Sequence, residues 1–258
     1  MIAEYKILRK HGWQFIPDVF AVTLPESYQQ GRPIITELAV ANEILQKAIE
    51  NCPTGALSGQ ADALQIDLGA CVFCGECQRI CGSDKIKFTN DYQIATNARE
   101  GLVVRQGQHP PIRLQPDKIR KEIRSYFGGS LKLRQISAAG DNSAEWELNA
   151  CSNPNFDMGR FGIEFLASPR HCDGIVITGP ISQNMAEATQ ICYDAVPNPK
   201  IVVLAGTDAI SGGIFAGSPA LDRSFLDKYP IDLYVPGNPP HPLAFICGIL
   251  DLMRSRKK

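Results

Sequence analysis

The strongest constraint on this chain is a run of four closely spaced cysteines, Cys71, Cys74, Cys77 and Cys81. The first three stand at intervals of three residues, and the fourth follows four residues later. A short turn with this spacing can present three thiolates on one concave surface, and soft thiolates are the usual ligands of iron–sulfur clusters. Zinc sites usually combine two separated Cys-x-x-Cys pairs, which this sequence lacks. The run therefore predicts a [4Fe–4S] site.

The run resembles the ligand run of bacterial two-cluster ferredoxins, in which the fourth cysteine of each run ligates the cluster of the other run. A second candidate for a fourth ligand is Cys52, which stands 29 residues before Cys81 and precedes a proline, as such ligands usually do. The resemblance covers roughly residues 30–92. It implies one [4Fe–4S] cluster, whose ligands are Cys52, Cys71, Cys74 and Cys77.

The first half of this internal repeat has lost its other ligands. Moving the cysteines of the second half back by 29 residues gives Asn42, Leu45 and Ala48. These positions fall within residues 37–50, whose apolar residues share one helical stripe, so we expect a helix that fills the lost site. Cys81 would have served the lost cluster. We expect it to be a free, buried thiol, and it is the alternative ligand if Cys52 does not serve.

Composition and charge limit the remaining possibilities. The formal net charge is −1 and no long basic run is present, so a nucleic-acid partner is not indicated. Nine cysteines, five of them in the cluster region, fit metal ligation in a reducing cytoplasm better than disulfides. The start lacks the apolar run of a signal peptide, and the longest apolar stretch, residues 242–253, is too short to span a membrane. We therefore expect a chain that does not itself cross a membrane.

The sequence divides into four segments. Residues 1–36 are predicted to form an irregular arm, and residues 37–92 an α+β ferredoxin-like domain with strands at 64–68 and 85–89. Residues 93–129 are predicted to be a linker with a helix over 115–127, and residues 130–258 an α/β domain.

In the last segment, strand and helix patterns alternate. Apolar runs at 174–178 and 200–205 are typical of buried parallel strands, and residues 131–136 and 231–235 are predicted to be further strands. Helices are expected at 182–196 and 241–254. This alternation predicts a doubly wound, flavodoxin-like parallel sheet with functional loops at the carboxyl ends of its strands.

Several segments of this domain occur together, in the same order, in a known family. They are Asn153-Pro154, Arg160-Phe161-Gly162-Ile163, Ala167-Ser168-Pro169-Arg170-His171, Thr178-Gly179-Pro180, Ser211-Gly212-Gly213-Ile214-Phe215 and Tyr234-Val235-Pro236-Gly237. Residues 130–253 thereby resemble the small subunit of membrane-bound, energy-converting nickel–iron hydrogenases, including that of formate hydrogenlyase. That subunit is related to the iron–sulfur subunit of respiratory complex I nearest the quinone.

The resemblance implies a proximal [4Fe–4S] cluster, but its four cysteine ligands are missing. The Cys-x-x-Cys-x-x-Glu loop of the family corresponds to residues 141–147, so Asp141 and Ala144 stand at cysteine positions. The cysteine of a Gly-x-Cys loop is replaced by Asp208, and the cysteine of Pro-Gly-Cys-Pro-Pro by Asn238. Alanine has no donor atom, and oxygen donors are poor partners for a soft iron–sulfur core. We therefore expect no proximal cluster.

Two interpretations of this altered site stay open. Its oxygen atoms could bind a hard cation such as magnesium or calcium, or they could form a hydrogen-bonded polar pocket. Glu145 and Glu147 are candidate proton-path acids, because the related subunits keep an acidic residue beside the cluster. The alternative for Glu147 is that it caps or pairs locally.

The resemblance implies an electron-transfer or structural subunit of an oxidoreductase-like complex. Such a subunit would dock a large-subunit homologue and couple to membrane-embedded, ion-translocating subunits. It would lie in the cytoplasm, peripheral on the inner face of the plasma membrane. The alternatives are a working electron-transfer subunit of a hydrogenase or of an NADH-quinone oxidoreductase-like complex, and a free-standing ferredoxin-type carrier or redox sensor. Four thiolate ligands support a single cluster, whereas a working hydrogenase subunit needs a chain of cofactors. This favours the subunit that docks a large-subunit homologue over the alternatives.

Overall fold

The computed structural model describes residues 2–12, 14–60 and 62–254. Its C-terminal part is built on a five-stranded parallel sheet in the order β10-β9-β8-β6-β7. These strands are β6 (Leu131–Ser137), β7 (Ile163–Phe165), β8 (Gly174–Thr178), β9 (Ile201–Ala205) and β10 (Leu233–Val235). Counted from β6 along the chain, this is the order 2-1-3-4-5 of flavodoxin-like sheets. The predicted doubly wound α/β domain is therefore confirmed.

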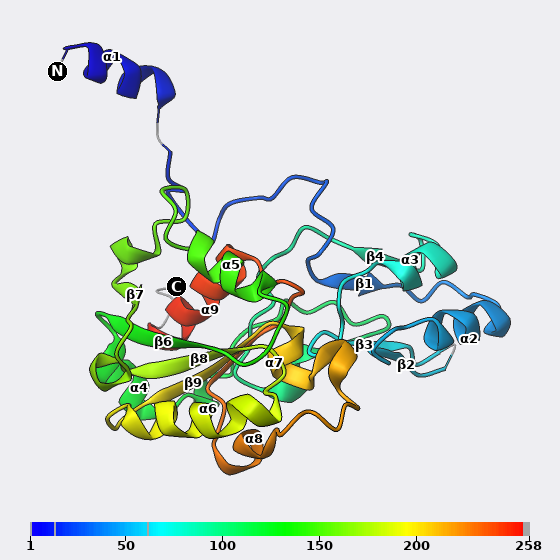
Figure 1. Cartoon of the computed structure of the whole chain (residues 1–258). Helices are drawn as coiled ribbons and strands as arrows, with labels where there is room; N and C mark the ends of the chain where they lie inside the picture. The colour runs from blue at the N-terminus through cyan, green and yellow to red at the C-terminus, as the bar shows by residue number, and fades with distance from the viewer. Residues whose placement is uncertain (1, 13, 61, 255–258) are drawn as a thin grey trace.

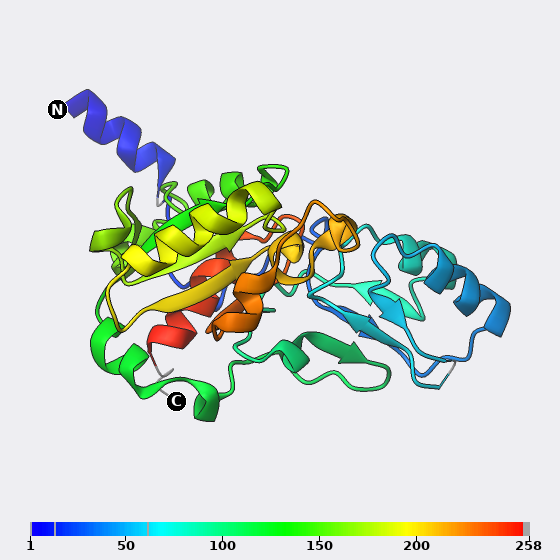
Figure 2. The same ribbon diagram turned by 60° about the horizontal axis from the view of Figure 1, so that its bottom comes forward.

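Helices cover both faces of this sheet (Figure 1). They are α4 (Lys121–Phe127), α5 (Ser143–Ala150), α6 (Gln183–Ala195), α7 (Thr207–Ser211), α8 (Ser224–Lys228) and α9 (Pro242–Met253). Helices α5 and α9 lie on one face, and α6 and α8 lie on the other, as the turned view in Figure 2 also shows. Strands β8 and β9 are buried at every position, because a parallel sheet between two helix layers has no exposed face.

Two small antiparallel sheets form the N-terminal part. Its elements are β1 (Pro33–Ile35), α2 (Asn42–Glu50), β2 (Leu57–Ser58), β3 (Gln65–Asp67), α3 (Glu76–Cys81), β4 (Ile86–Phe88) and β5 (Val103–Arg105). Strand β1 pairs with β4, and β3 pairs with both β2 and β5. The order strand–helix–strand thus occurs twice, and α2 packs against α3. This order agrees with an internal repeat, while the ferredoxin-like assignment stays a prediction.

Five short 3₁₀ helices lie in the segments that connect the described helices and strands. They are η1 (Arg99–Leu102), η2 (Pro116–Lys118), η3 (Met158–Phe161), η4 (Pro169–His171) and η5 (Gly213–Phe215). The single helix predicted over residues 115–127 is in fact divided into η2 and α4. Ile119 and Arg120 between them are not helical, and Arg120 instead pairs with Asp232, with its Nη2 2.9 Å from Oδ2.

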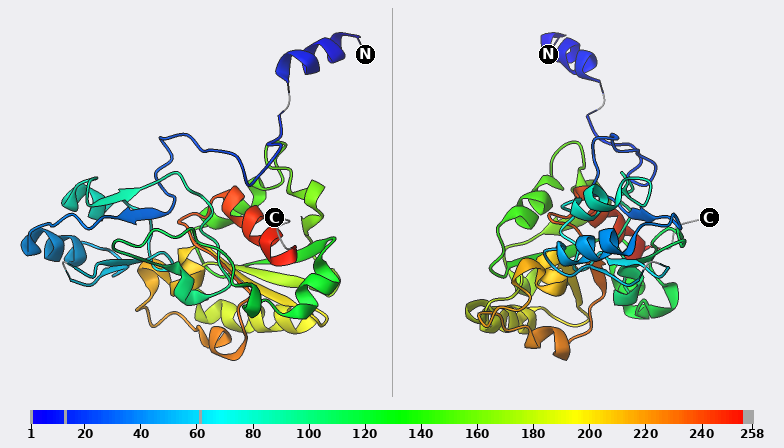
Figure 3. Two further views of the ribbon diagram at one scale, coloured as in Figure 1. Left: turned by 180° about the vertical axis from the view of Figure 1, so that it is seen from behind. Right: turned by 90° about the vertical axis from the view of Figure 1, so that its right-hand side faces the viewer.

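Ordered elements lie in the segments predicted as an irregular arm and as a linker with one helix, so these segments are more regular than expected. The arm contains α1 (Ile2–His11), which projects from the rest of the chain (Figures 1 and 3). Glu4 in its first turn and basic residues in its last turn suit the helix dipole. The predicted linker contributes β5 to a sheet, and the arm contributes β1. Both strands have three residues and partners far along the chain, so local sequence does not reveal them.

Helix α2 begins at Asn42, five residues later than predicted. Lys85 is fully buried, and its Nζ donates to the carbonyl oxygens of Thr36 at 3.0 Å and Leu38 at 2.8 Å. A helix starting at residue 37 would use these carbonyls for its own N–H groups. The buried lysine binds them instead, and it needs them because an unpaired ammonium is costly to bury.

The N-terminal part contacts the C-terminal part beside α7 (Figure 1). Thr207, the first residue of α7, donates its hydroxyl to the carbonyl oxygen of Cys71 at 2.7 Å. Thr96 forms an isolated bridge with Tyr234 of β10. The predicted cysteine run therefore lies next to the carboxyl ends of the parallel strands, where ligands bind in open α/β sheets.

Candidate functional site

Four cysteines from two loops line one small pocket, here called the cysteine pocket. They are Cys52, Cys71, Cys74 and Cys77, the four predicted cluster ligands. Cys52 lies in the turn after α2, and the other three lie in and just after the loop between β3 and α3. Pairing of β2 with β3 and packing of α2 on α3 bring these segments together. The four predicted ligands therefore lie together in the structure, and their role as ligands stays a prediction.

The loop with three of these cysteines is tightly wound. Phe73 has a φ of +54° and Gly75 a φ of +72°, both in the left-handed region that bends a chain sharply. The Phe73 N–H donates to Cys71 Sγ at 3.3 Å, a contact that orients a sulfur ligand. The Phe73 ring packs edge-on against Phe88, with ring centroids 6.0 Å apart, and so fixes the loop on β4.

Burial and mutual proximity oppose ionisation of these thiols. Burial raises the pKa of Cys71 far above its ordinary range, and the neighbouring cysteines raise it further. Burial, together with the other thiols, raises the pKa of Cys77 to about 12, and burial and Cys52 raise the pKa of Cys74. Thiolates gathered in this way require a positive partner, which is what bound iron provides.

A buried hydroxyl in the cysteine pocket supports the fit of such a group. Thr54 lines the pocket, and its Oγ1 is inaccessible to solvent and has no hydrogen-bond partner, the cysteine sulfurs included. Buried hydroxyls are almost always paired, so a group bound in the pocket would be a candidate partner for this donor. The sulfur atoms of a [4Fe–4S] cluster would supply one.

No three histidine, cysteine, aspartate or glutamate side chains among the described residues are arranged to hold a single metal ion. A cubane differs from a single ion in this respect, because each of its four irons takes one thiolate and the ligands surround the cluster.

Cys81 does not line the cysteine pocket. It is the last residue of α3, a helix with no buried residue, and its thiol is half-buried. The expectation that this thiol is buried is therefore wrong. Burial raises its pKa, and the nearby ammonium of Lys85 lowers it. Its role as an orphan thiol or an alternative ligand stays a prediction.

A helix occupies the positions where the internal repeat predicts that ligands were lost. Helix α2 contains Asn42, Leu45 and Ala48, and the last two are buried. In the second half, by contrast, Cys71 and Cys74 precede α3 in an open loop. The predicted helix is therefore present with apolar side chains buried, while the loss of a ligand loop at this place stays a prediction.

A second pocket, here called the acidic pocket, lies at the carboxyl ends of the parallel strands. The four positions where the family resemblance expects cysteines all line it: Asp141, Ala144, Asp208 and Asn238. They follow β6, β9 and β10, and Glu145 lines the same pocket. The structure thus brings together one alanine, two aspartates and one asparagine where the family resemblance expects a cluster.

Hydrogen bonds from neighbouring side chains and backbone fix two carboxylates of the acidic pocket, those of Asp141 and Glu145. The hydroxyl and the backbone N–H of Ser143 donate to Asp141 Oδ1 at 2.6 and 2.9 Å and hold its pKa below the ordinary range. Glu145 is only 6% exposed, and the Thr178 hydroxyl donates to its Oε1 at 2.6 Å. Burial raises the pKa of Asp208, and the charges of Asp141 and Glu145 raise it further.

Glu147 does not line the acidic pocket. Burial raises its pKa, and it lies near Tyr28, whose pKa burial and the Glu147 charge raise to about 12. The Tyr28 ring packs on His241, with centroids 5.1 Å apart, and burial lowers the pKa of His241 to about 4. No pattern in the sequence points to this cluster, because its members come from the arm, α5 and the start of α9.

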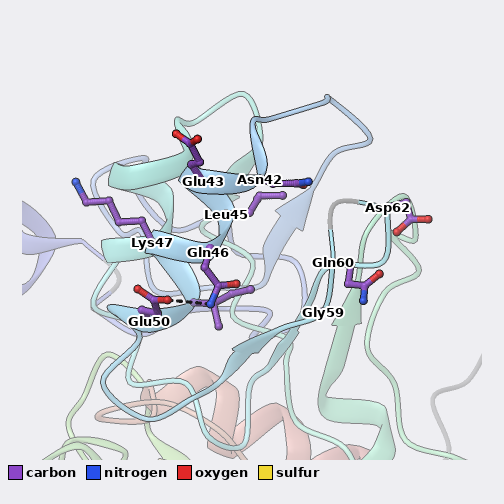
Figure 4. Close-up of a pocket in the computed structure, with 10 residues that line it drawn as sticks. Asn42, Glu43, Leu45, Gln46, Lys47, Glu50, Gly59, Gln60 and Asp62 are labelled. Atoms are coloured by element: carbon purple, nitrogen blue, oxygen red, sulfur yellow. Dashed lines mark hydrogen bonds between the residues drawn. The ribbon is translucent and has the colours of Figure 1, made fainter.

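A broad open hollow lies on α2, and no cysteine is among its lining residues (Figure 4). Most of its lining residues are polar, and those from the helix include both charges, on Glu43, Lys47 and Glu50. Gln46 Nε2 donates to Glu50 Oε1 at 2.9 Å across one turn. Nothing in this lining points to a particular ligand.

Known proteins resemble the C-terminal part of the chain. The profile described as "NADH ubiquinone oxidoreductase, 20 Kd subunit" matches residues 142–252. The "Probable membrane-bound hydrogenase subunit mbhJ" of Pyrococcus furiosus is 31% identical over 129 residues, which span 50% of this chain and 77% of that protein. The chain belongs to the family of the NADH ubiquinone oxidoreductase 20 Kd subunit. The predicted relationship to membrane-bound hydrogenase and complex I subunits is thereby confirmed at the level of the family.

Two further relatives are named as subunits of NADH-quinone oxidoreductase. That of Heliobacterium modesticaldum is 43% identical over 107 residues, which span 41% of this chain and 61% of the relative. That of Bacteroides thetaiotaomicron is 41% identical over 112 residues, which span 43% of this chain and 57% of the relative. The chain therefore spans less than two thirds of either protein.

One solved structure with a matching chain is titled "Structure of the membrane-bound sulfane sulfur reductase (MBS), an archaeal respiratory membrane complex". The match has 33% identity and a TM-score of 0.43, and it covers 49% of this chain and 70% of that chain. In the part of the present chain that the structure describes, no helix has the length and apolar character needed to cross a membrane.

Proposed function

We propose that this chain is an iron–sulfur subunit of a membrane-associated complex and that it carries one cluster. In this proposal Cys52, Cys71, Cys74 and Cys77 hold a [4Fe–4S] cluster in a ferredoxin-like N-terminal domain. The C-terminal domain docks a large-subunit homologue and has lost the proximal cluster of the family. The observation that carries the proposal is the separation of ligand types between two pockets, one with four thiols and the other with none.

A [4Fe–4S] cluster supplies one-electron transfer when it is bound. The residues of this chain would fix its place. Phe73 orients Cys71 through its N–H, and the Thr207 hydroxyl ties the carbonyl of Cys71 to α7. The cysteine pocket is thereby held against the helix that carries Asp208. An electron arriving there would find no thiolate-bound acceptor in the acidic pocket, which favours a structural C-terminal domain over a working hydrogenase subunit.

Exposed apolar side chains on α5, which carries acidic-pocket residues, and on η5, which contacts α7, support docking of a partner. Trp146 of α5, next to Glu145, is 71% exposed, and Ile214 of η5 is 61% exposed. Phe215 beside it is also exposed. Large apolar side chains left in solvent around a hollow are typical of protein interfaces, where aromatic residues act as anchors.

The partners are inferred from the relatives. Their names place them as a subunit of a membrane-bound hydrogenase and as subunits of NADH-quinone oxidoreductases. By analogy, this chain would bind a large-subunit homologue and, through it, membrane-embedded ion-translocating subunits. It would then lie on the cytoplasmic face of the plasma membrane as a peripheral subunit.

Copurification with a large-subunit homologue tests this function. The tagged chain is co-expressed with that homologue and isolated from solubilised membranes, both as wild type and as a Trp146→Ala/Ile214→Ala variant. We expect the wild type to retain the partner and the variant to lose most of it. Tyr126→Ala is the matched control, because Tyr126 is 69% exposed but lies on α4, at the amino end of β6.

Recovery of the wild-type chain alone would contradict the docking proposal and favour a free-standing carrier or redox sensor. Equal loss of the partner from the Tyr126→Ala control would contradict the assignment of the docking surface.

A further inference from the structure

We infer that the Thr54 hydroxyl donates a hydrogen bond to a sulfur atom of the bound cluster and thereby raises its reduction potential. This inference rests on the proposed [4Fe–4S] site and assigns a positioning and tuning residue to it. The hydroxyl is a donor that the protein itself leaves without an acceptor.

Thr54 stands two residues after Cys52, in a turn closed by the Gly55 N–H donating to the Cys52 carbonyl oxygen at 3.2 Å. Gly55 has a φ of +64°, which allows the chain to reverse here. The turn fixes the position of Thr54 relative to the predicted ligand, and Thr54 lines the cysteine pocket.

Orphaned polar side-chain atoms are rare in the described part of the chain, where they are Thr54 Oγ1, Arg124 Nε and Thr189 Oγ1. Arg124 lies on α4 and Thr189 on α6, and neither lines the cysteine pocket. Thr54 is thus the orphan that coincides with the predicted cofactor site. A threonine hydroxyl has one proton to donate, and the group that would fill this pocket has only sulfur acceptors to offer.

The direction of the effect follows from charge. Reduction adds one negative charge to the cluster, and a hydrogen-bond donor stabilises that charge more than it stabilises the oxidised state. Hydrogen bonds to cluster sulfurs are among the features that set the potentials of iron–sulfur proteins. Removal of the Thr54 donor should therefore make the cluster harder to reduce.

The test is a redox titration of the anaerobically purified full chain, with dithionite as the reductant and the electron paramagnetic resonance signal of the reduced cluster as the readout. Thr54→Val keeps the shape of the side chain and removes the hydroxyl. At the midpoint potential of the wild type, we expect this variant to show a three- to tenfold lower ratio of reduced to oxidised cluster. A tenfold change corresponds to about 59 mV for one electron.

Two variants serve as controls. Thr54→Ser retains the hydroxyl and should keep the wild-type midpoint. Thr189→Val removes the orphaned hydroxyl on α6 by the same chemical change and should leave the midpoint unchanged. An intact cluster with an unshifted midpoint in Thr54→Val would overturn the inference, as would an equal shift in Thr189→Val.

Iron content covers the case in which Thr54→Val does not hold a cluster. If Thr54→Ser then retains its iron, the hydroxyl is required at the site and the inference stands. If Thr54→Ser also loses its iron, the methyl packing of the side chain matters rather than its hydrogen bond, and the inference is overturned. A wild-type chain without iron would instead overturn the proposed function itself.

Discussion

The cysteine pocket and the acidic pocket lie side by side but are lined by opposite chemistry. One gathers four thiols from the N-terminal part, and the other gathers carboxylates and an amide at the strand ends of the C-terminal part. The Thr207 hydroxyl, bonded to the Cys71 carbonyl, joins the two. The four positions at which the resemblance expects cysteines meet in the acidic pocket, although none of them is a cysteine.

Under the proposed function, the chain has lost clusters in two places and by two routes. Within the N-terminal repeat, Leu45 and Ala48 are buried where ligands would stand. At the acidic pocket, Asp141 is exposed and hydrogen-bonded, and Asp208 is partly exposed. A buried vacancy has to be filled with apolar atoms, whereas a vacancy at the rim of a sheet can be filled with polar groups that remain partly hydrated.

The largest expected effect concerns the cysteine pocket. Cys52→Ala should abolish or convert the cluster, because the crossed ligation of two-cluster ferredoxins assigns Cys52 to it. Cys81→Ala should leave the visible and electron paramagnetic resonance spectra of the cluster unchanged, since Cys81 does not line the pocket. If Cys81→Ala destroys the cluster and Cys52→Ala does not, the assignment of Cys52 from the repeat is wrong.

The next effect concerns the hydrogen bonds of the acidic pocket. Thr178→Val should lower the free energy of unfolding by about 1–3 kcal/mol, because it leaves the buried Glu145 carboxylate without its hydroxyl donor. Urea unfolding followed by circular dichroism measures this loss. The double variant Thr178→Val/Glu145→Leu should lose less than the sum of the two single variants. Full additivity would show that the two side chains do not act as a pair.

A smaller, pH-dependent effect is expected at Asp208. Its pKa in the folded chain lies above its ordinary value, so folding favours the protonated form, and ionisation costs stability as the pH rises above about 3.9. Asp208→Asn should therefore be more stable than the wild type at pH 7, by less than about 1 kcal/mol because the carboxyl is partly hydrated. The difference should vanish at lower pH.

Asp222→Asn is the control for this prediction, with the opposite sign. Hydrogen bonds from Ser224 lower the pKa of Asp222, so this carboxylate contributes stability that is present above its ordinary pKa and is lost as the pH falls through its folded value. Denaturant midpoints at pH 4 and pH 7 compare the two variants. A less stable Asp208→Asn at pH 7 would contradict the account of the acidic pocket.

The smallest effect should come from restoring a single cysteine. Ala144→Cys adds one thiol to a pocket whose other three former ligand positions carry oxygen or amide groups. One thiolate does not hold a cubane, so the iron content of this variant should equal that of the wild type. An increase in iron per chain would show that the acidic pocket still accepts a cluster.

Much of the C-terminal fold follows from the sequence, because its signals are local. The apolar runs predicted β8 and β9 to within one residue, and α6 and α9 also lie where their patterns predict them. Strand β7 has only three residues at the sheet edge, and nothing in its own sequence distinguishes it. The shorter α2 depends on Lys85, which binds carbonyls almost fifty residues earlier in the chain.

In the two pockets, too, some features could be predicted from local sequence and others depend on tertiary packing. Cysteine spacing and family alignment identified which residues would gather, because spacing and loop position are sequence properties. They did not identify the unpaired Thr54 hydroxyl, the Thr207–Cys71 bond or the cluster of Tyr28 with His241. These contacts join segments that only tertiary packing brings together. The partial exposure of Cys81 could likewise not be predicted from the sequence, because it depends on how α3 packs at the surface.

The most direct test of the account is the iron and acid-labile sulfide content of the anaerobically purified wild-type chain. One cluster at the cysteine pocket predicts about four irons and four sulfides per chain, with a single [4Fe–4S] signal on reduction. About eight irons per chain, with two interacting signals, would mean that a second cluster survives in the acidic pocket or in the first half of the repeat. That result would contradict the account, as would a chain that binds no iron at all.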